Sequence, residues 1–235
     1  MPDEKPILYL AHGDDLFAIQ SFERDLVAHM GDDPGMVELN VTRLDGRHAR
    51  LEDLAAAAQT LPFLAERRMV ILAHAQDLAR GEAAQKRLIA LLDTLPASTA
   101  LVIGLPDDAE GGEKKIKAFK TRLLKWAQAA GPRAFVREFR LPVQAAMPGW
   151  ILERAKQAGG RFERGAAELL ATSIGNDTAA AAQEIDKLLT YVDYSRPVEA
   201  EDVQALTPAS SQTTVFELVD RMAEGDTRQA LRSLR

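Results

Sequence analysis

The 235-residue sequence lacks several features that common classes of protein need. It contains no cysteine, which excludes disulfides, Cys-ligated zinc and thiol catalysis. The histidines are isolated and include no helical pair of the kind that binds zinc. No apolar run approaches the roughly 20 residues that span a bilayer, and the opening MPDEKP does not resemble a signal peptide. We therefore expect a cytoplasmic protein with no membrane association, no metal and no cofactor.

The sequence also lacks the lysine of a phosphate-binding loop. An apolar strand, Ile7–Ala11, and a helix from Leu16 flank a turn at the position where many α/β proteins hold a phosphate. A P-loop there needs Gly-Lys followed by Ser or Thr, and this chain has no Gly-Lys dipeptide. The turn instead carries two carboxylates, which would repel a triphosphate. Its residues are His12, Gly13, Asp14 and Asp15.

Three further catalytic alternatives fail on sequence context. A nucleotide hydrolase of this layout would place Asp-Glu after the strand in RRMVILA, where this chain has His74-Ala75-Gln76-Asp77. A polymerase-type Gly-Asp-Asp needs a β-hairpin, whereas here a helix follows, so Asp14 or Asp15 is expected to cap that helix. No Ser/His/Asp arrangement has a suitable context either. The sequence thus predicts no intrinsic catalysis.

The net charge is −6, although proteins that wrap nucleic acid are usually basic. Residues 110–140 are an exception, with nine basic residues against three acidic ones. This stretch is either a solvated helix face or a supporting, nonspecific DNA contact. The candidate DNA contacts are Lys114, Lys115, Lys117, Lys120 and Lys125.

Strand and helix patterns alternate over the first 140 residues, which predicts a mostly parallel sheet flanked by helices. Helical spacing is expected over 16–30, 51–61, 83–95 and 116–126. Extended segments are expected over Ile7–Ala11, Val37–Leu44, Met69–Ala73, Ala100–Leu105 and Phe135–Leu141.

From Pro142 onward the patterns are helical only. Helices are expected over Trp150–Ala158, Gly165–Ile174, from an N-cap at Asn176, and over Ala200–Leu206. Residues 207–212 read as a linker before another helix from Val215. We therefore predict an α/β domain over 1–141, a small helical domain over 142–209 and the start of a third domain over 210–235, which ends as if cut short.

The stretch TLPFLAERRMVIL, residues 60–72, brings two large apolar residues to a helix-to-strand corner. Pro62 should end the preceding Ala-rich helix. Phe63 and Leu64 then either fold back into the core or are offered to a partner's pocket. In the second case each is worth about 1.5–3 kcal/mol when fully buried there.

Five stretches together resemble the delta subunit family of the bacterial DNA polymerase III clamp loader. They are LYLAHGDDLFAI, NVTRLDG, TLPFLAERRMVIL, GNDTAAAAQEIDKLLTYV and TVFELVDRMAEGDTRQAL, and they occur in the family's order. The resemblance implies an AAA+-like fold with a decayed nucleotide site, a helical lid-like domain and a helical collar of which this chain keeps only the start.

The resemblance also implies a function as a non-catalytic component of the DNA-directed DNA polymerase holoenzyme in DNA replication. The family binds the sliding clamp (the beta subunit) and helps to open it for loading onto primed DNA. In the family, an apolar pair enters the clamp's pocket, and in this sequence it corresponds to Phe63 and Leu64, with Leu61 and Pro62 beside them. The order here is Phe-Leu, whereas the family often has Leu-Phe. Other clamp-loader subunits would bind through the collar, so this chain alone is expected to be monomeric. The alternatives are a nucleotide-binding AAA+ ATPase and a DNA-binding module of the same fold.

Overall fold

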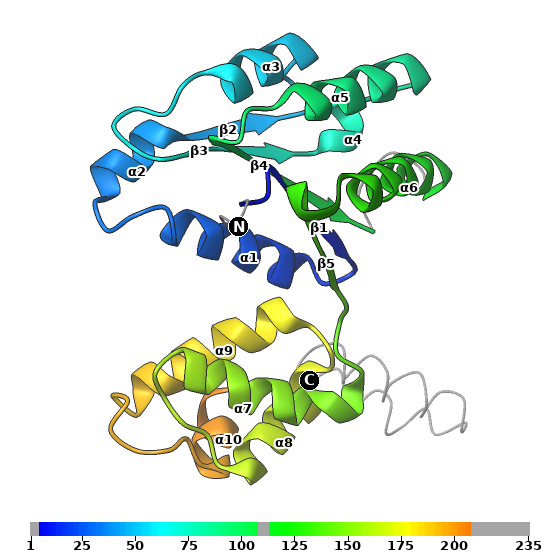
Figure 1. The fold of residues 1–235 in the computed structure, drawn as a ribbon. Coiled ribbons are helices and arrows are strands. Elements are labelled where there is room, and N and C mark those ends of the chain that lie inside the picture. Colours follow the sequence, from blue (N-terminus) through cyan, green and yellow to red (C-terminus); the bar gives the residue numbers. More distant parts are fainter. Residues whose placement is uncertain (1–4, 108–112, 208–235) are drawn as a thin grey trace. The chain divides into compact units, whose positions relative to one another are not determined.

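The computed structural model describes residues 5–107 and 113–207, with only the backbone of residues 113–116. The chain divides into two compact units, residues 1–140 and 141–235 (Figure 1). The expected linker after Thr207 and the expected third domain, residues 210–235, lie outside the described residues.

In the described part of the first unit, five strands form one parallel sheet in the order β2-β3-β4-β1-β5. The predicted parallel sheet with flanking helices is thus confirmed. The strands are β1 (Leu8–Gly13), β2 (Val41–Asp45), β3 (Arg68–Ala73), β4 (Thr99–Pro106) and β5 (Ala134–Phe139).

Helices cover both faces of this sheet (Figure 1). Alternate strand residues point to opposite faces, so Val70 and Leu72 join the main core while Met69 and Ile71 face the other side. The main core is covered by α3 (Leu51–Gln59), α4 (Ala75–Leu78), α5 (Glu82–Thr94) and α6 (Glu113–Ala130), and the opposite face by α1 (Leu16–Ala28). A short 3₁₀ turn, Gly131–Arg133, leads from α6 into β5.

The expected extended segment Val37–Leu44 is wrong over its first half. Residues Pro34–Asn40 form a helix, α2, and only then does β2 begin. Asp33 explains the difference, because its carboxylate accepts the amide N–H of Gly35 at 2.9 Å and caps the helix. Pro34 follows at the first helical position, where its fixed φ suits a helix start.

The described part of the second unit is helical. After a 3₁₀ turn, Gln144–Ala146, come α7 (Met147–Gln157), α8 (Arg164–Ile174), α9 (Thr178–Tyr191) and α10 (Ala200–Leu206). Their apolar faces share a second core that includes Ile151, Leu170 and Leu188. The expected N-cap at Asn176 is wrong by one residue, because Asp177 accepts the amide N–H of Ala180 at 2.9 Å.

Candidate functional site

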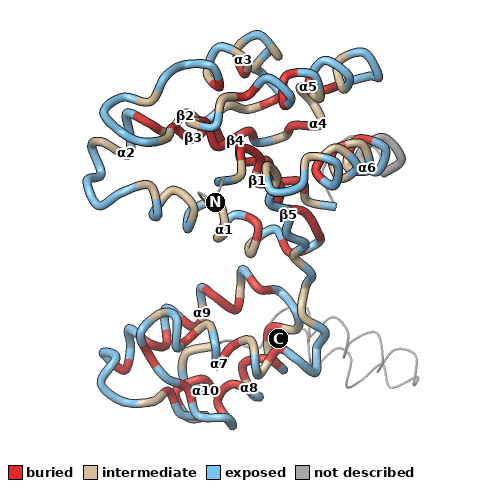
Figure 2. Tube along the Cα trace, in the orientation of Figure 1, coloured by how far each residue is buried: buried red, intermediate tan, exposed pale blue. Residues whose placement is uncertain are grey.

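The loop between α3 and β3 presents an apolar surface to solvent. Leu61, Phe63 and Leu64 are exposed by 77%, 54% and 81% of their surface, and most of this loop is exposed (Figure 2). The alternative that Phe63 and Leu64 fold back into the core is therefore wrong. We call residues 61–64 the apolar corner.

The backbone of the apolar corner is held from a distant part of the chain. The side chain of Asn40, at the end of α2, accepts the N–H of Phe63 at 2.7 Å and donates to its carbonyl oxygen at 2.9 Å. Leu64 adopts a left-handed conformation with φ of +49°, which L-residues with a Cβ rarely adopt. The corner thus has a defined and locally strained shape.

The two arginines that follow the corner are used within the fold. The Nη2 group of Arg67 donates hydrogen bonds to the carbonyl oxygens of Pro6 at 2.6 Å and Thr99 at 2.8 Å. Arg68 is buried and donates to the hydroxyl of Thr42 at 2.7 Å. These bonds fix the start of β3, so the corner leaves the sheet from a rigid base.

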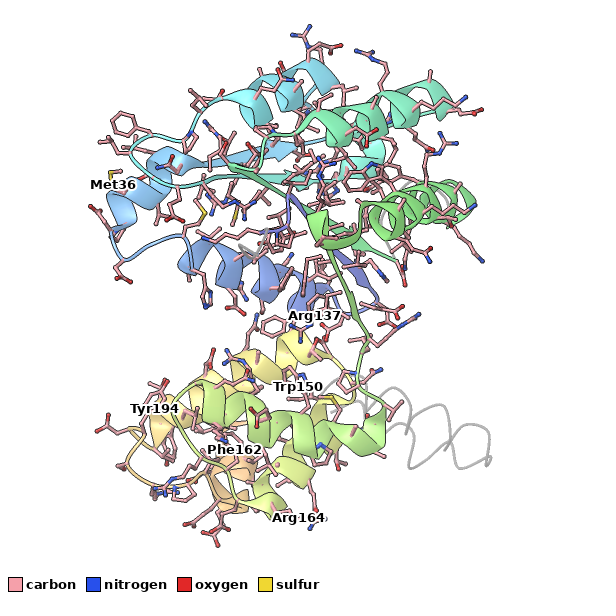
Figure 3. All side chains as sticks on the ribbon, in the orientation of Figure 1. Met36, Arg137, Trp150, Phe162, Arg164 and Tyr194 are labelled. Carbon is pink, nitrogen blue, oxygen red and sulfur yellow. The ribbon has the colours of Figure 1, made fainter. Side chains whose placement is uncertain are left out.

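A cavity of about 520 Å³ lies beside the corner. Leu64 and Arg67 line it, and Tyr9 of β1, Met30 in the turn after α1 and Met36 of α2 contribute apolar surface. Met36 is labelled in Figure 3. The corner and the cavity share the edge of the sheet at which the parallel strands begin.

The turn between β1 and α1 is held by hydrogen bonds within the protein. Asp15 is buried and caps α1, accepting the amide N–H of Ala18 at 2.9 Å. The amide N–H of Asp15 donates a long hydrogen bond to the carbonyl oxygen of Phe139, with 3.4 Å between nitrogen and oxygen. Gly13 has φ of +136°, and an added Cβ would collide with the same Phe139 carbonyl. The amide N–H groups of Asp15 and Ala18 are therefore bonded within the protein.

The charged groups around this turn are also paired. Lys120 on α6 binds the carboxylate of Asp107 at 2.7 Å. Burial lowers the pKa of His12 below its ordinary value, and the Lys120 ammonium lowers it further against the opposing effect of Glu138. Nδ1 of His12 lies 3.9 Å from a Glu138 oxygen, too far for a hydrogen bond. Among the described residues, the turn thus carries a buried imidazole of lowered pKa and a lysine whose charge is offset by Asp107.

The predicted lysine face of α6 is only partly available to a ligand. Lys117 and Lys125 are exposed, whereas Lys120 is only 17% exposed and bonded to Asp107. The side chains of Lys114 and Lys115 lie outside the described residues. Two exposed cations on one helix face fit both alternatives, a solvated helix face and a supporting, nonspecific DNA contact.

Within the parts of the chain that the structure describes, no group of three or more His, Cys, Asp or Glu residues is placed to hold a metal ion. No helix in those parts is long and apolar enough to cross a membrane.

Three comparisons relate this fold to known proteins. A family model described as "DNA polymerase III, delta subunit" matches residues 9–127, just over half of the chain. A curated relative, DNA polymerase III subunit delta of Bacillus subtilis, is 24% identical over 201 residues, which are 83% of this chain and 55% of the relative. The chain thus spans about half the length of that relative.

Solved structures agree on the fold. The DNA clamp loader delta protein of Bacillus subtilis matches with a TM-score of 0.67 and 20% identity, over 98% of this chain and 66% of that chain. A variant of the RuvB protein of Thermotoga maritima matches with a TM-score of 0.50 and 14% identity, over 85% of this chain and 60% of that chain. The fold is therefore AAA+-like, an α/β unit followed by a helical region. Together with the family model, these likenesses show that the chain belongs to the DNA polymerase III delta subunit family.

Proposed function

We propose that the chain is the clamp-binding part of a replicative clamp-loader delta subunit, and that it docks on the sliding clamp through the apolar corner. The observation that carries the proposal is that Leu61, Phe63 and Leu64 are exposed together on a loop whose backbone is held at Phe63. A few residues carry most of the binding energy of a protein interface, and aromatic residues such as Phe63 are enriched at interfaces.

A fixed corner suits the task of opening a ring. A ligand favours an open state only by as much as it binds that state more tightly than the closed one. Anchors that are already positioned lose little conformational entropy on docking, so more of their burial energy remains for that difference. The cavity beside Leu64 adds a second surface, lined by both apolar and charged residues, along the same edge.

The closed β1–α1 turn supports a role without ATP binding or hydrolysis by this chain. Its two carboxylates, its capped helix and its internally bonded backbone all oppose a triphosphate. The chain would then contribute to the holoenzyme by binding rather than by catalysis. Other clamp-loader subunits would assemble through a collar domain.

DNA contact would be secondary. Lys117 and Lys125 are the exposed members of the predicted lysine face with described side chains, and they can supply nonspecific attraction to phosphates within an assembled loader. The net charge of −6 opposes tight DNA binding by the chain alone.

Surface plasmon resonance with the sliding clamp of the same organism tests the proposal. The chain should bind the immobilised clamp, and an excess of a linear peptide with the sequence of residues 60–68 should compete with it. A peptide with the same composition in scrambled order serves as the control. Absence of binding, or binding that the native-sequence peptide does not reduce, would contradict the proposal.

A further inference from the structure

Among the described residues, only the side chain of Asn40 both accepts a hydrogen bond from the backbone of the apolar corner and donates one to it. It lies 23 positions before Phe63 in the sequence and is 1% exposed. Its Oδ1 accepts the Phe63 N–H at 2.7 Å, and its Nδ2 donates to the Phe63 carbonyl at 2.9 Å. The same Nδ2 donates to the carbonyl of Met36 at 2.9 Å, which ties the pair to the last turn of α2.

A carboxamide is required for this arrangement. It offers an acceptor and a donor side by side, so one side chain satisfies both main-chain groups of a single residue, as a neighbouring strand would. An ionised aspartate could accept the N–H but could not donate to either carbonyl. Both bonds are partly buried, and main-chain groups that lose their partners while shielded from water are costly, so the loop without Asn40 would rearrange to find others.

The conformation of Leu64 shows why the loop needs such a restraint. Its left-handed φ of +49° directly follows the residue that Asn40 holds. Left-handed backbone is unfavourable for a residue with a Cβ, and it persists where the surroundings over-determine it. Phe63 is fixed on both main-chain groups, and this restraint sets the direction in which the Leu64 side chain leaves the backbone.

We propose that Asn40 is a positioning residue for clamp binding, which holds Phe63 and Leu64 in the docking conformation before the clamp arrives. This inference rests on the proposed function. Without the two hydrogen bonds the corner would populate its binding conformation only part of the time, and the apparent dissociation constant would rise in proportion. Asn40 itself is buried and needs no contact with the clamp.

The first test compares Asn40→Ala with the unaltered chain by surface plasmon resonance. We expect the dissociation constant of the variant to be about tenfold higher, which corresponds to about 1.4 kcal/mol. The variant should still bind the clamp at least as tightly as the linear peptide of residues 60–68 does. Ile103→Val in β4 is the matched control. It removes a buried methylene from the same unit, far from the corner, so it should lower thermal stability and leave the affinity for the clamp unchanged.

The second test needs no clamp, and its first measurement needs no variant. In the unaltered chain, the Phe63 amide should exchange with deuterium more slowly than the other amides of residues 61–66, although the loop is exposed. In Asn40→Ala that protection should disappear, while exchange in β3 and β4 stays unchanged.

The two tests distinguish a failure of the assignment of Asn40 from a failure of the proposed function. An unprotected Phe63 amide in the unaltered chain, or a folded Asn40→Ala that binds the clamp as tightly as the unaltered chain, would overturn the assignment of Asn40. If the unaltered chain fails to bind the clamp, the proposed function fails, and the exchange experiment still decides whether Asn40 fixes the loop.

Discussion

Replacing Phe63 and Leu64 together by alanine should affect binding much more than stability. Folding leaves 54% of Phe63 and 81% of Leu64 exposed, so the fold gains little from either side chain. Scaling about 1.5–3 kcal/mol for full burial of each side chain by the buried fractions gives a loss of about 1–2 kcal/mol in the free energy of unfolding. Two core positions would instead lose about 5–10 kcal/mol together.

The exposed fractions of the same two side chains are what remains to be buried on the clamp. The same scaling gives about 2–4 kcal/mol of binding free energy from them. Because about 1.4 kcal/mol is a factor of ten, the affinity for the clamp should fall by about thirtyfold to several hundredfold.

Thermal melting measures the first quantity and surface plasmon resonance on the clamp measures the second. The melting temperature should fall by about 2–8 °C, since about 1 kcal/mol shifts it by about 2–4 °C in a protein of this size. Val143→Ala, at a position in the second unit that is 70% exposed, is the control and should change neither quantity much. Collapse of the melting transition, or unchanged clamp affinity in a folded double variant, would refute the reasoning.

Three further predictions concern the β1–α1 turn and the lysine face. Titration calorimetry should detect no ATP binding, and micromolar affinity that is lost on mutation of residues 12–15 would contradict this. Gly13→Ala should destabilise the first unit by about 2 kcal/mol or more, seen as a lower melting temperature, because the new Cβ would meet the Phe139 carbonyl at a positive φ; an unchanged melting temperature would count against this account of the turn. Lys117→Ala with Lys125→Ala should weaken DNA binding equally for all sequences and lower its salt dependence, and a loss confined to one sequence would show that the face reads bases.

Much of the fold follows from local patterns in the sequence. The strands around Leu8, Val70 and Val102 are short apolar runs because both faces of a parallel sheet are covered. The cap of α1 was predicted to be Asp14 or Asp15, and the structure selects Asp15. A side chain that bonds within three residues of its own position leaves a signal that can be read locally.

The sequence did not reveal α2 or the role of Asn40. The alternation of Val37, Leu39 and Val41 resembles a strand, and the capping signal of Asp33-Pro34 outweighs it only because the cap bonds form. The bonds from Asn40 to Phe63 join residues far apart in the chain, so no spacing rule points to them. The sequence likewise leaves open whether Phe63 and Leu64 are core or surface, because burial depends on what packs above the loop.

The corner and the β1–α1 turn lie at opposite edges of the sheet, and this separates their roles. The corner precedes β3, and the turn follows β1. Both strands run parallel in one sheet, so the strand beginnings share one edge and the strand ends share the other. A six-residue strand spans about 20 Å, which is farther than the range over which substitutions usually couple. A change in the β1–α1 turn at one edge should therefore not disturb Asn40, Phe63 and Leu64 at the other. Stability changes from Gly13→Ala and from the double alanine variant should for the same reason add within about 0.5 kcal/mol.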